Sequence, residues 1–122
     1  MKYMLLIYGN QQTWDLLDKI GFDDLMKRHA ALGEELAASG EFVGSSGLTV
    51  EGARTVRVRD GGATVTDGPY AEAKEVLAGY YLVECDSLER ATDIARQIPE
   101  AELNLVEIRE LMDPRTQYGP RG

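Results

Sequence analysis

The stretch TVTDGPYAEAKEVLAGYYLVE, residues 64 to 84, places an Asp-Gly-Pro turn between two segments that have the character of β-strands. The second segment, residues 79 to 84, is rich in the aromatic and β-branched residues that favour strands. Side chains along a strand point alternately to its two faces, yet Tyr80, Tyr81 and Leu82 are all largely apolar. Both faces of this predicted strand therefore need to be covered.

Apolar periodicity predicts the elements on either side of this stretch. A helix is expected over Phe22 to Ser39, where apolar residues recur at spacings of three and four, and Gly40 is well placed to end it. Ser87 is expected to cap a second helix, which Pro99 ends. Thr13 to Leu17 is expected to form only a short helical turn after a break at 9–12, and Asp60-Gly61-Gly62 a hairpin turn. The remaining strands are predicted at 1–8, 41–50, 55–59, 63–66 and 103–111.

This order of elements predicts the fold class. Two β-α-β halves with an inserted hairpin indicate an α+β protein, a ferredoxin-like sandwich in which an antiparallel sheet carries both helices on one face. The first strand repeats the pattern of 79–84, because both of its faces are largely apolar. A second copy of the sheet is the economical cover for the face without helices, so we expect a homodimer packed sheet to sheet.

Composition limits the classes of function. The 122 residues suit a single domain, placed at 1–112 and followed by a loosely held tail at 113–122. With 13 basic and 21 acidic side chains the net charge is −8, which argues against direct binding to nucleic acid. No apolar run approaches the roughly 20 residues of a membrane helix. Cys85 is the single cysteine, which excludes an intrachain disulfide and suits a reducing compartment such as the cytoplasm.

Several cofactor chemistries are disfavoured by the residues present. One histidine and one cysteine cannot make a conventional zinc site within a single chain. The glycine motifs of phosphate loops, dinucleotide sites and nucleophile elbows are absent from the sequence. Cys85 is expected to be a buried, unreactive thiol. No metal or cofactor is therefore expected.

Two residues carry candidate chemistry, and each has a structural alternative. His29 lies in the apolar stripe of the first predicted helix, where it is either a core histidine hydrogen-bonded to a carbonyl or a general base oriented by a carboxylate from elsewhere in the chain. Asp67-Gly68-Pro69 is either a bend that the fold requires or a turn that holds a working carboxylate. Tyr8 and Trp14 either line an apolar pocket or simply pack.

The chain resembles the YCII-related proteins. Residues 66–75, TDGPYAEAKE, followed by Gly79-Tyr80-Tyr81, closely resemble the family's DGPF signature, and the likeness extends from Met1 to about Met112. Tyr70 stands where phenylalanine is usual, and the proline-containing turn common before the hairpin is replaced by 49–52, TVEG.

The resemblance implies a dimeric α+β barrel with a pocket where a helix histidine and an aspartate meet. Carried onto this chain, the catalytic pair is His29 and Asp67. For an enzyme acting on a small, mostly apolar ligand, we expect His29 to move a proton, Asp67 to orient the imidazole ring, and Tyr8, Tyr70 or Tyr81 to position the substrate. Muconolactone isomerases share the barrel architecture, which makes acid–base chemistry on a small molecule the first hypothesis. The second is a ligand-binding or regulatory module that partners a sigma factor, as the family's transcription-initiation labels imply.

Overall fold

Six strands and four helices make up the part of the chain that the computed structural model describes, residues 1–68 and 74–113. The strands are β1 (Lys2–Gly9), β2 (Phe42–Gly47), β3 (Arg54–Arg59), β4 (Gly62–Asp67), β5 (Val76–Glu84) and β6 (Leu105–Glu110). The helices are α1 (Gln11–Ile20), α2 (Phe22–Ser39), α3 (Leu88–Arg96) and α4 (Glu100–Leu103). Tyr70 and most of the expected C-terminal tail lie outside the described residues.

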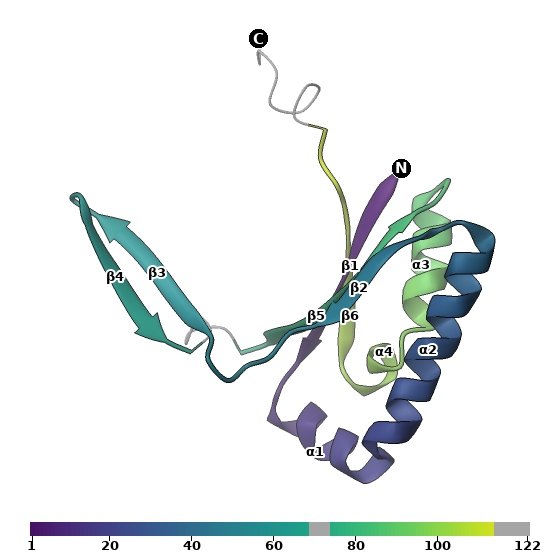
Figure 1. Cartoon of the computed structure of the whole chain (residues 1–122), viewed down its shortest axis with the longest axis horizontal. Coiled ribbons are helices and arrows are strands. Elements are labelled where there is room, and N and C mark those ends of the chain that lie inside the picture. Colours follow the sequence, from purple (N-terminus) through teal and green to yellow (C-terminus); the bar gives the residue numbers. More distant parts are fainter. Residues whose placement is uncertain (69–73, 114–122) are drawn as a thin grey trace.

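The larger sheet has four strands in the order β2-β5-β1-β6, and every neighbouring pair is antiparallel. The helices lie on one side of this sheet, and the β3–β4 hairpin forms a second sheet that reaches away from it (Figure 1). The predicted α+β class with antiparallel strands is therefore confirmed. No described helix has the length and apolar character needed to cross a membrane.

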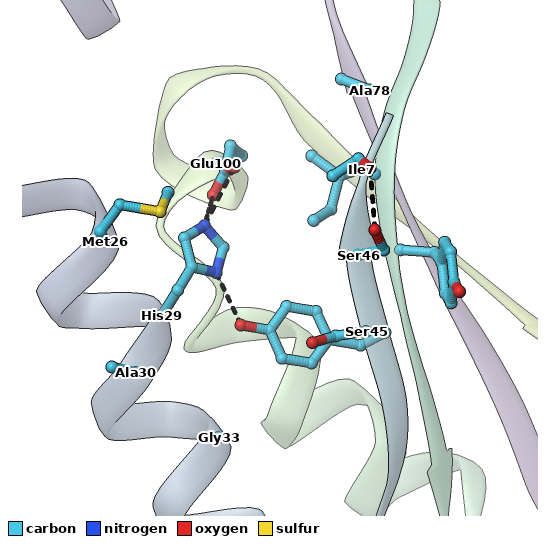
Figure 2. A pocket seen from close by; sticks show the side chains of 13 residues that line it. Ile7, Met26, His29, Ala30, Gly33, Ser45, Ser46, Ala78 and Glu100 are labelled. Atoms are coloured by element: carbon cyan, nitrogen blue, oxygen red, sulfur yellow. Dashed lines mark hydrogen bonds and ion pairs between the residues drawn. The ribbon is translucent and has the colours of Figure 1, made fainter. Parts of the chain in front are cut away.

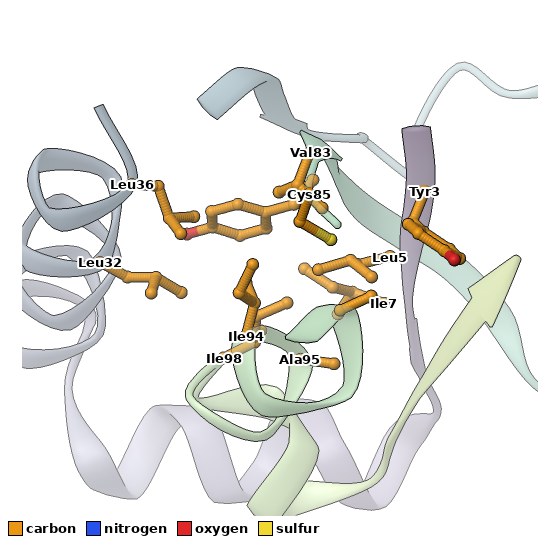
Figure 3. Packing of buried hydrophobic residues seen from close by; sticks show 12 residues of the cluster. Tyr3, Leu5, Ile7, Leu32, Leu36, Val83, Cys85, Ile94, Ala95 and Ile98 are labelled. Carbon is orange, nitrogen blue, oxygen red and sulfur yellow. The ribbon is translucent and has the colours of Figure 1, made fainter. Parts of the chain in front are cut away.

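The hydrophobic core fills the space between the larger sheet and the helices. In β1, the side chains of Tyr3, Leu5 and Ile7 are buried toward α2 and α3, as Figure 3 shows. The alternate residues of β1 are only partly buried. Strand alternation thus divides β1 into a face that the helices cover and a face that they leave open, in line with the prediction that helices cover only one side of the sheet. The core cluster comprises Tyr3, Leu5, Ile7, Leu32, Leu36, Tyr81, Val83, Cys85, Ala91, Ile94, Ala95 and Ile98.

The predicted bounds of α2 are confirmed, because its ends are marked by local signals. Gly40 adopts the left-handed conformation, with φ 81°, and its N–H reaches back to carbonyls of the last turn. Asp23 and Asp24 lie in the first turn, where negative charge is favoured by the helix dipole.

The starts of two helices were missed in the sequence. The expected break at 9–12 contains the cap of α1: the side chain of Asn10 accepts from the backbone N–H of Thr13, whose hydroxyl accepts from the Asn10 N–H, so a full ten-residue helix follows. The predicted end of the second helix is confirmed, because α3 stops at Arg96, shortly before Pro99, but the helix after Pro99 was not predicted. Proline suits the start of a helix, and Pro99 leads into the short helix α4, which begins at Glu100.

The β3–β4 hairpin turns through two residues. Asp60 and Gly61 both have positive φ, 52° and 78°, which matches the twist of the flanking strands. Val56, Val58 and Val65 share one face of the hairpin and are more than half exposed.

Polar clamps join elements that are distant in sequence. Arg90 on α3 makes two charged hydrogen bonds, of 2.8 and 2.7 Å, to the carboxylate of Glu41 before β2. The carboxylate of Glu75 accepts from the side-chain amides of Asn10, at 3.3 Å, and Asn104, at 2.7 Å. Glu75 thereby connects the segment before β5 with the cap of α1 and the start of β6.

Candidate functional site

His29 is held at both ring nitrogens near the middle of α2. Its Nε2 lies 2.8 and 3.1 Å from the two carboxylate oxygens of Glu100, and its Nδ1 lies 2.6 Å from the hydroxyl of Tyr81. Figure 2 shows the His29 imidazole with one ring nitrogen directed at Glu100. The rings of His29 and Tyr81 also stack, with centroids 5.8 Å apart. Three elements, α2, β5 and α4, therefore converge on one imidazole.

The protonation pattern follows from the chemistry of the partners. An ionised carboxylate can only accept, so Nε2 of His29 carries a hydrogen and donates to Glu100. In the neutral ring Nδ1 then accepts, and the Tyr81 hydroxyl donates to it. Burial, followed by the nearby Glu100 charge, raises the pKa of Tyr81 to about 12. Tyr81 therefore stays a neutral phenol near neutral pH, able to donate a hydrogen bond.

A cavity of about 420 Å³ opens beside this cluster. On α2 its wall consists of Met26, His29, Ala30 and Gly33, and a Cβ added at Gly33 would meet no atom within 4 Å. The small residues Ala30 and Gly33 leave room for the cavity on this face of the helix. The opposite wall is formed by Ile7, Ser45, Ser46, Gly47, Ala78, Gly79, Tyr80 and Tyr81, and Glu100 completes it.

A second hollow of about 330 Å³ adjoins the first. The two share Ile7, Met26, Gly47, Ala78 and Glu100 in their walls. The second is otherwise lined by Tyr8, Thr13, Trp14, Leu17, Leu48 and Val50.

The structure brings together only some of the residues expected at the site. His29 and Tyr81 meet, but Asp67 ends β4, where it lies 3.2 Å from Arg54 with its side chain 91% exposed. The described partners of His29 thus include Glu100 in place of the expected Asp67. The hairpin that carries Asp67 reaches away from α2, which accounts for the difference.

The remaining two tyrosines have different outcomes. Tyr8 lines the second hollow, and its hydroxyl lies 3.3 Å from a carboxylate oxygen of Glu107. Tyr70 lies outside the described residues.

Sequence reasoning missed Glu100. A carboxylate from elsewhere in the chain was expected beside His29, but 71 residues separate the pair and many acids were available. The signal that could have found it is Pro99 followed by Glu100: proline favours the start of a helix, and a helix there would fix the position of the acid relative to the sheet.

Comparison with known proteins agrees with the resemblance seen in the sequence. The model of the YCII-related domain matches residues 1–115. An uncharacterised protein of Rhizobium meliloti (strain 1021) is 32% identical over 102 residues, which cover 83% of this chain and 82% of that protein. Since the domain match spans nearly the whole sequence, the chain belongs to the YCII-related family.

Proposed function

We propose that the protein is an enzyme that moves a proton at a carbon next to a carbonyl group of a small molecule. The observation that carries this proposal is His29, bound by Glu100 at one nitrogen and by Tyr81 at the other, on the wall of an open cavity. A carboxylate, an imidazole and a hydroxyl in this order form a hydrogen-bonded relay that can hold and release a proton.

Each of these three residues has a role in the proposed reaction. The Tyr81 hydroxyl donates to the carbonyl oxygen of the ligand, which frees Nδ1 of His29. Nδ1 then takes the proton from the adjacent carbon; the C–H bond breaks, and its electron pair becomes the enolate that Tyr81 stabilises. Glu100 stabilises the imidazolium ion. Return of the proton to the same carbon gives exchange with solvent, and its return to another carbon gives isomerisation.

Exchange of ligand protons with deuterium tests the proposal without knowledge of the natural substrate. Simple ketones such as 2-butanone and 2-octanone are incubated with the protein in D2O, and loss of their proton signals is followed by NMR. The wild type should accelerate exchange, and His29→Gln should lower the acceleration by about 10²-fold or more. Tyr81→Phe should lower it as well, through the missing donor.

Glu102→Gln is the matched control for Glu100→Gln. Glu102 lies on the same short helix, but its side chain is 68% exposed and pairs with Arg28. Exchange should fall in Glu100→Gln and stay at the wild-type rate in Glu102→Gln, with circular dichroism showing that both are folded. If ketones bind and the wild type leaves their exchange rate unchanged, the protein is a ligand-binding module and the enzymatic proposal fails.

We further propose that the chain works as a homodimer, a dimeric α+β barrel built from two ferredoxin-like sandwiches. Support comes from the open face of the larger sheet, where the half-buried side chains include Met4, Leu6 and Leu82. Contiguous apolar surface on one face of a protein often marks an interface with a partner. In the proposed dimer, Asp67 of one protomer reaches the pocket of its partner. A monomeric mass by light scattering at micromolar concentration would exclude the dimer.

A further inference from the structure

We propose that the two hollows form one binding site for an uncharged, elongated molecule with a single carbonyl group at one end. This inference rests on the proposed function for the polar end of the ligand. It goes further by assigning the ligand's charge, shape and orientation.

The shared wall supports a single site. Both hollows use Ile7, Met26 and Ala78, and Glu100 lies on the boundary of both. A ligand whose carbonyl group reaches Tyr81 can therefore extend its remaining carbons past the shared residues into the second hollow.

The lining residues indicate an uncharged ligand. Among the described residues that line either hollow, the charged or basic groups are His29 and Glu100, and these two already pair with each other. Lysine and arginine are absent from this described lining. A ligand carboxylate or phosphate would thus lie beside the Glu100 carboxylate without a cation of its own, which is unfavourable in a partly buried site.

The lining of the second hollow indicates that the part of the ligand bound there is apolar. Trp14 and Leu17 approach it from α1, and Leu48 and Val50 from the segment after β2. Each CH2 group transferred from water to such a surface should increase affinity about three- to fourfold. Binding should therefore tighten steadily along a homologous series until the hollow is filled.

A series of 2-alkanones from 2-butanone to 2-dodecanone tests this inference. Affinity is measured by NMR titration, with the indole N–H signal of Trp14, the single tryptophan, as the reporter for the second hollow. The long ketones should shift this signal and gain about three- to fourfold in affinity per carbon, while 2-butanone should leave the signal in place. The alkanoate of equal length should bind at least about tenfold more weakly.

Neighbouring leucines on α1 provide a matched pair of variants. Leu17 lines the second hollow, whereas Leu16 is 40% exposed and is not among the described lining residues. Leu17→Asp should remove the gain in affinity with chain length, and Leu16→Asp should preserve it. Val50→Asp, on a different segment, gives the same test if Leu17→Asp does not fold.

The outcomes separate this inference from the proposed function. Affinity that is flat along the series, or alkanoates that bind as tightly as ketones, overturns the inference even if deuterium exchange occurs. Length-dependent binding without exchange supports the inference and overturns the enzymatic proposal.

Discussion

Removal of the Tyr81 hydroxyl should change how stability depends on alkaline pH. Burial and the Glu100 charge raise the pKa of this phenol from 10.0 to about 12, so the folded protein holds the proton more tightly than the unfolded chain. The stabilisation is complete below about pH 10 and is lost as the pH rises from about 10 to 12. Since one pKa unit corresponds to about 1.36 kcal/mol, the loss at about pH 11 is about 1.4 kcal/mol.

Urea unfolding of the wild type and of Tyr81→Phe between about pH 8 and 11, at one protein concentration, measures this effect. Tyr81→Phe has its own cost, about 1 kcal/mol for the hydrogen bond to His29, but that cost is present at the lower pH values too. The decisive quantity is the free energy of unfolding of the wild type minus that of Tyr81→Phe, which should fall by about 1.4 kcal/mol from about pH 8 to 11, that is from about +1 to about −0.4 kcal/mol. A difference that stays constant with pH would show that Tyr81 does not lie buried beside Glu100.

Two further predictions concern stability away from the site. Arg90 holds the pKa of Glu41 at about 2, so Glu41→Gln should lower the free energy of unfolding at neutral pH by about 1–2 kcal/mol, after allowance for the partial exposure of Arg90. The cost of Glu41→Gln should vanish as the pH falls from about 5 toward 2. Urea unfolding measures this cost, and Glu102→Gln serves as the control. Because Glu102 belongs to an exposed ion pair, its substitution should lower the free energy of unfolding by less than about 0.5 kcal/mol. Gly9→Ala would place a methyl group against the ring of Trp14, so thermal unfolding should show a loss of about 1–3 kcal/mol, and an unchanged melting temperature would mean that the ring moves freely.

Local signals explain which parts of the fold could be predicted. The bounds of α2 follow from an apolar stripe that ends at Gly40, and helices were expected to cover one face of β1, although alternation between two apolar faces did not show which one. The errors at Asn10 and Pro99 have a common cause: each of these residues interrupts an apolar pattern and also favours the start of a helix. Periodicity alone cannot distinguish the two roles.

The site was harder to predict, because contacts between distant segments decide it. His29 and Tyr81 were named as candidates from the sequence and the family resemblance, and the structure brings them together. The carboxylate beside His29 depends on how α4 packs against β1 and β6, which no spacing in the sequence encodes. Asp67 stood out in the signature, yet its position is set by a hairpin that reaches away from the helices.

The clamp at Glu75 has a consequence for the kinetics of folding. Its carboxylate joins Asn10, 65 residues away, and Asn104, 29 residues away, so both hydrogen bonds require β1, β5 and β6 to be aligned already. Because they need the three strands in place first, we expect both contacts to form after the folding transition state. Glu75→Gln should then leave the refolding rate almost unchanged and increase the unfolding rate. Glu75 would thus lengthen the lifetime of the native state without affecting how fast it forms.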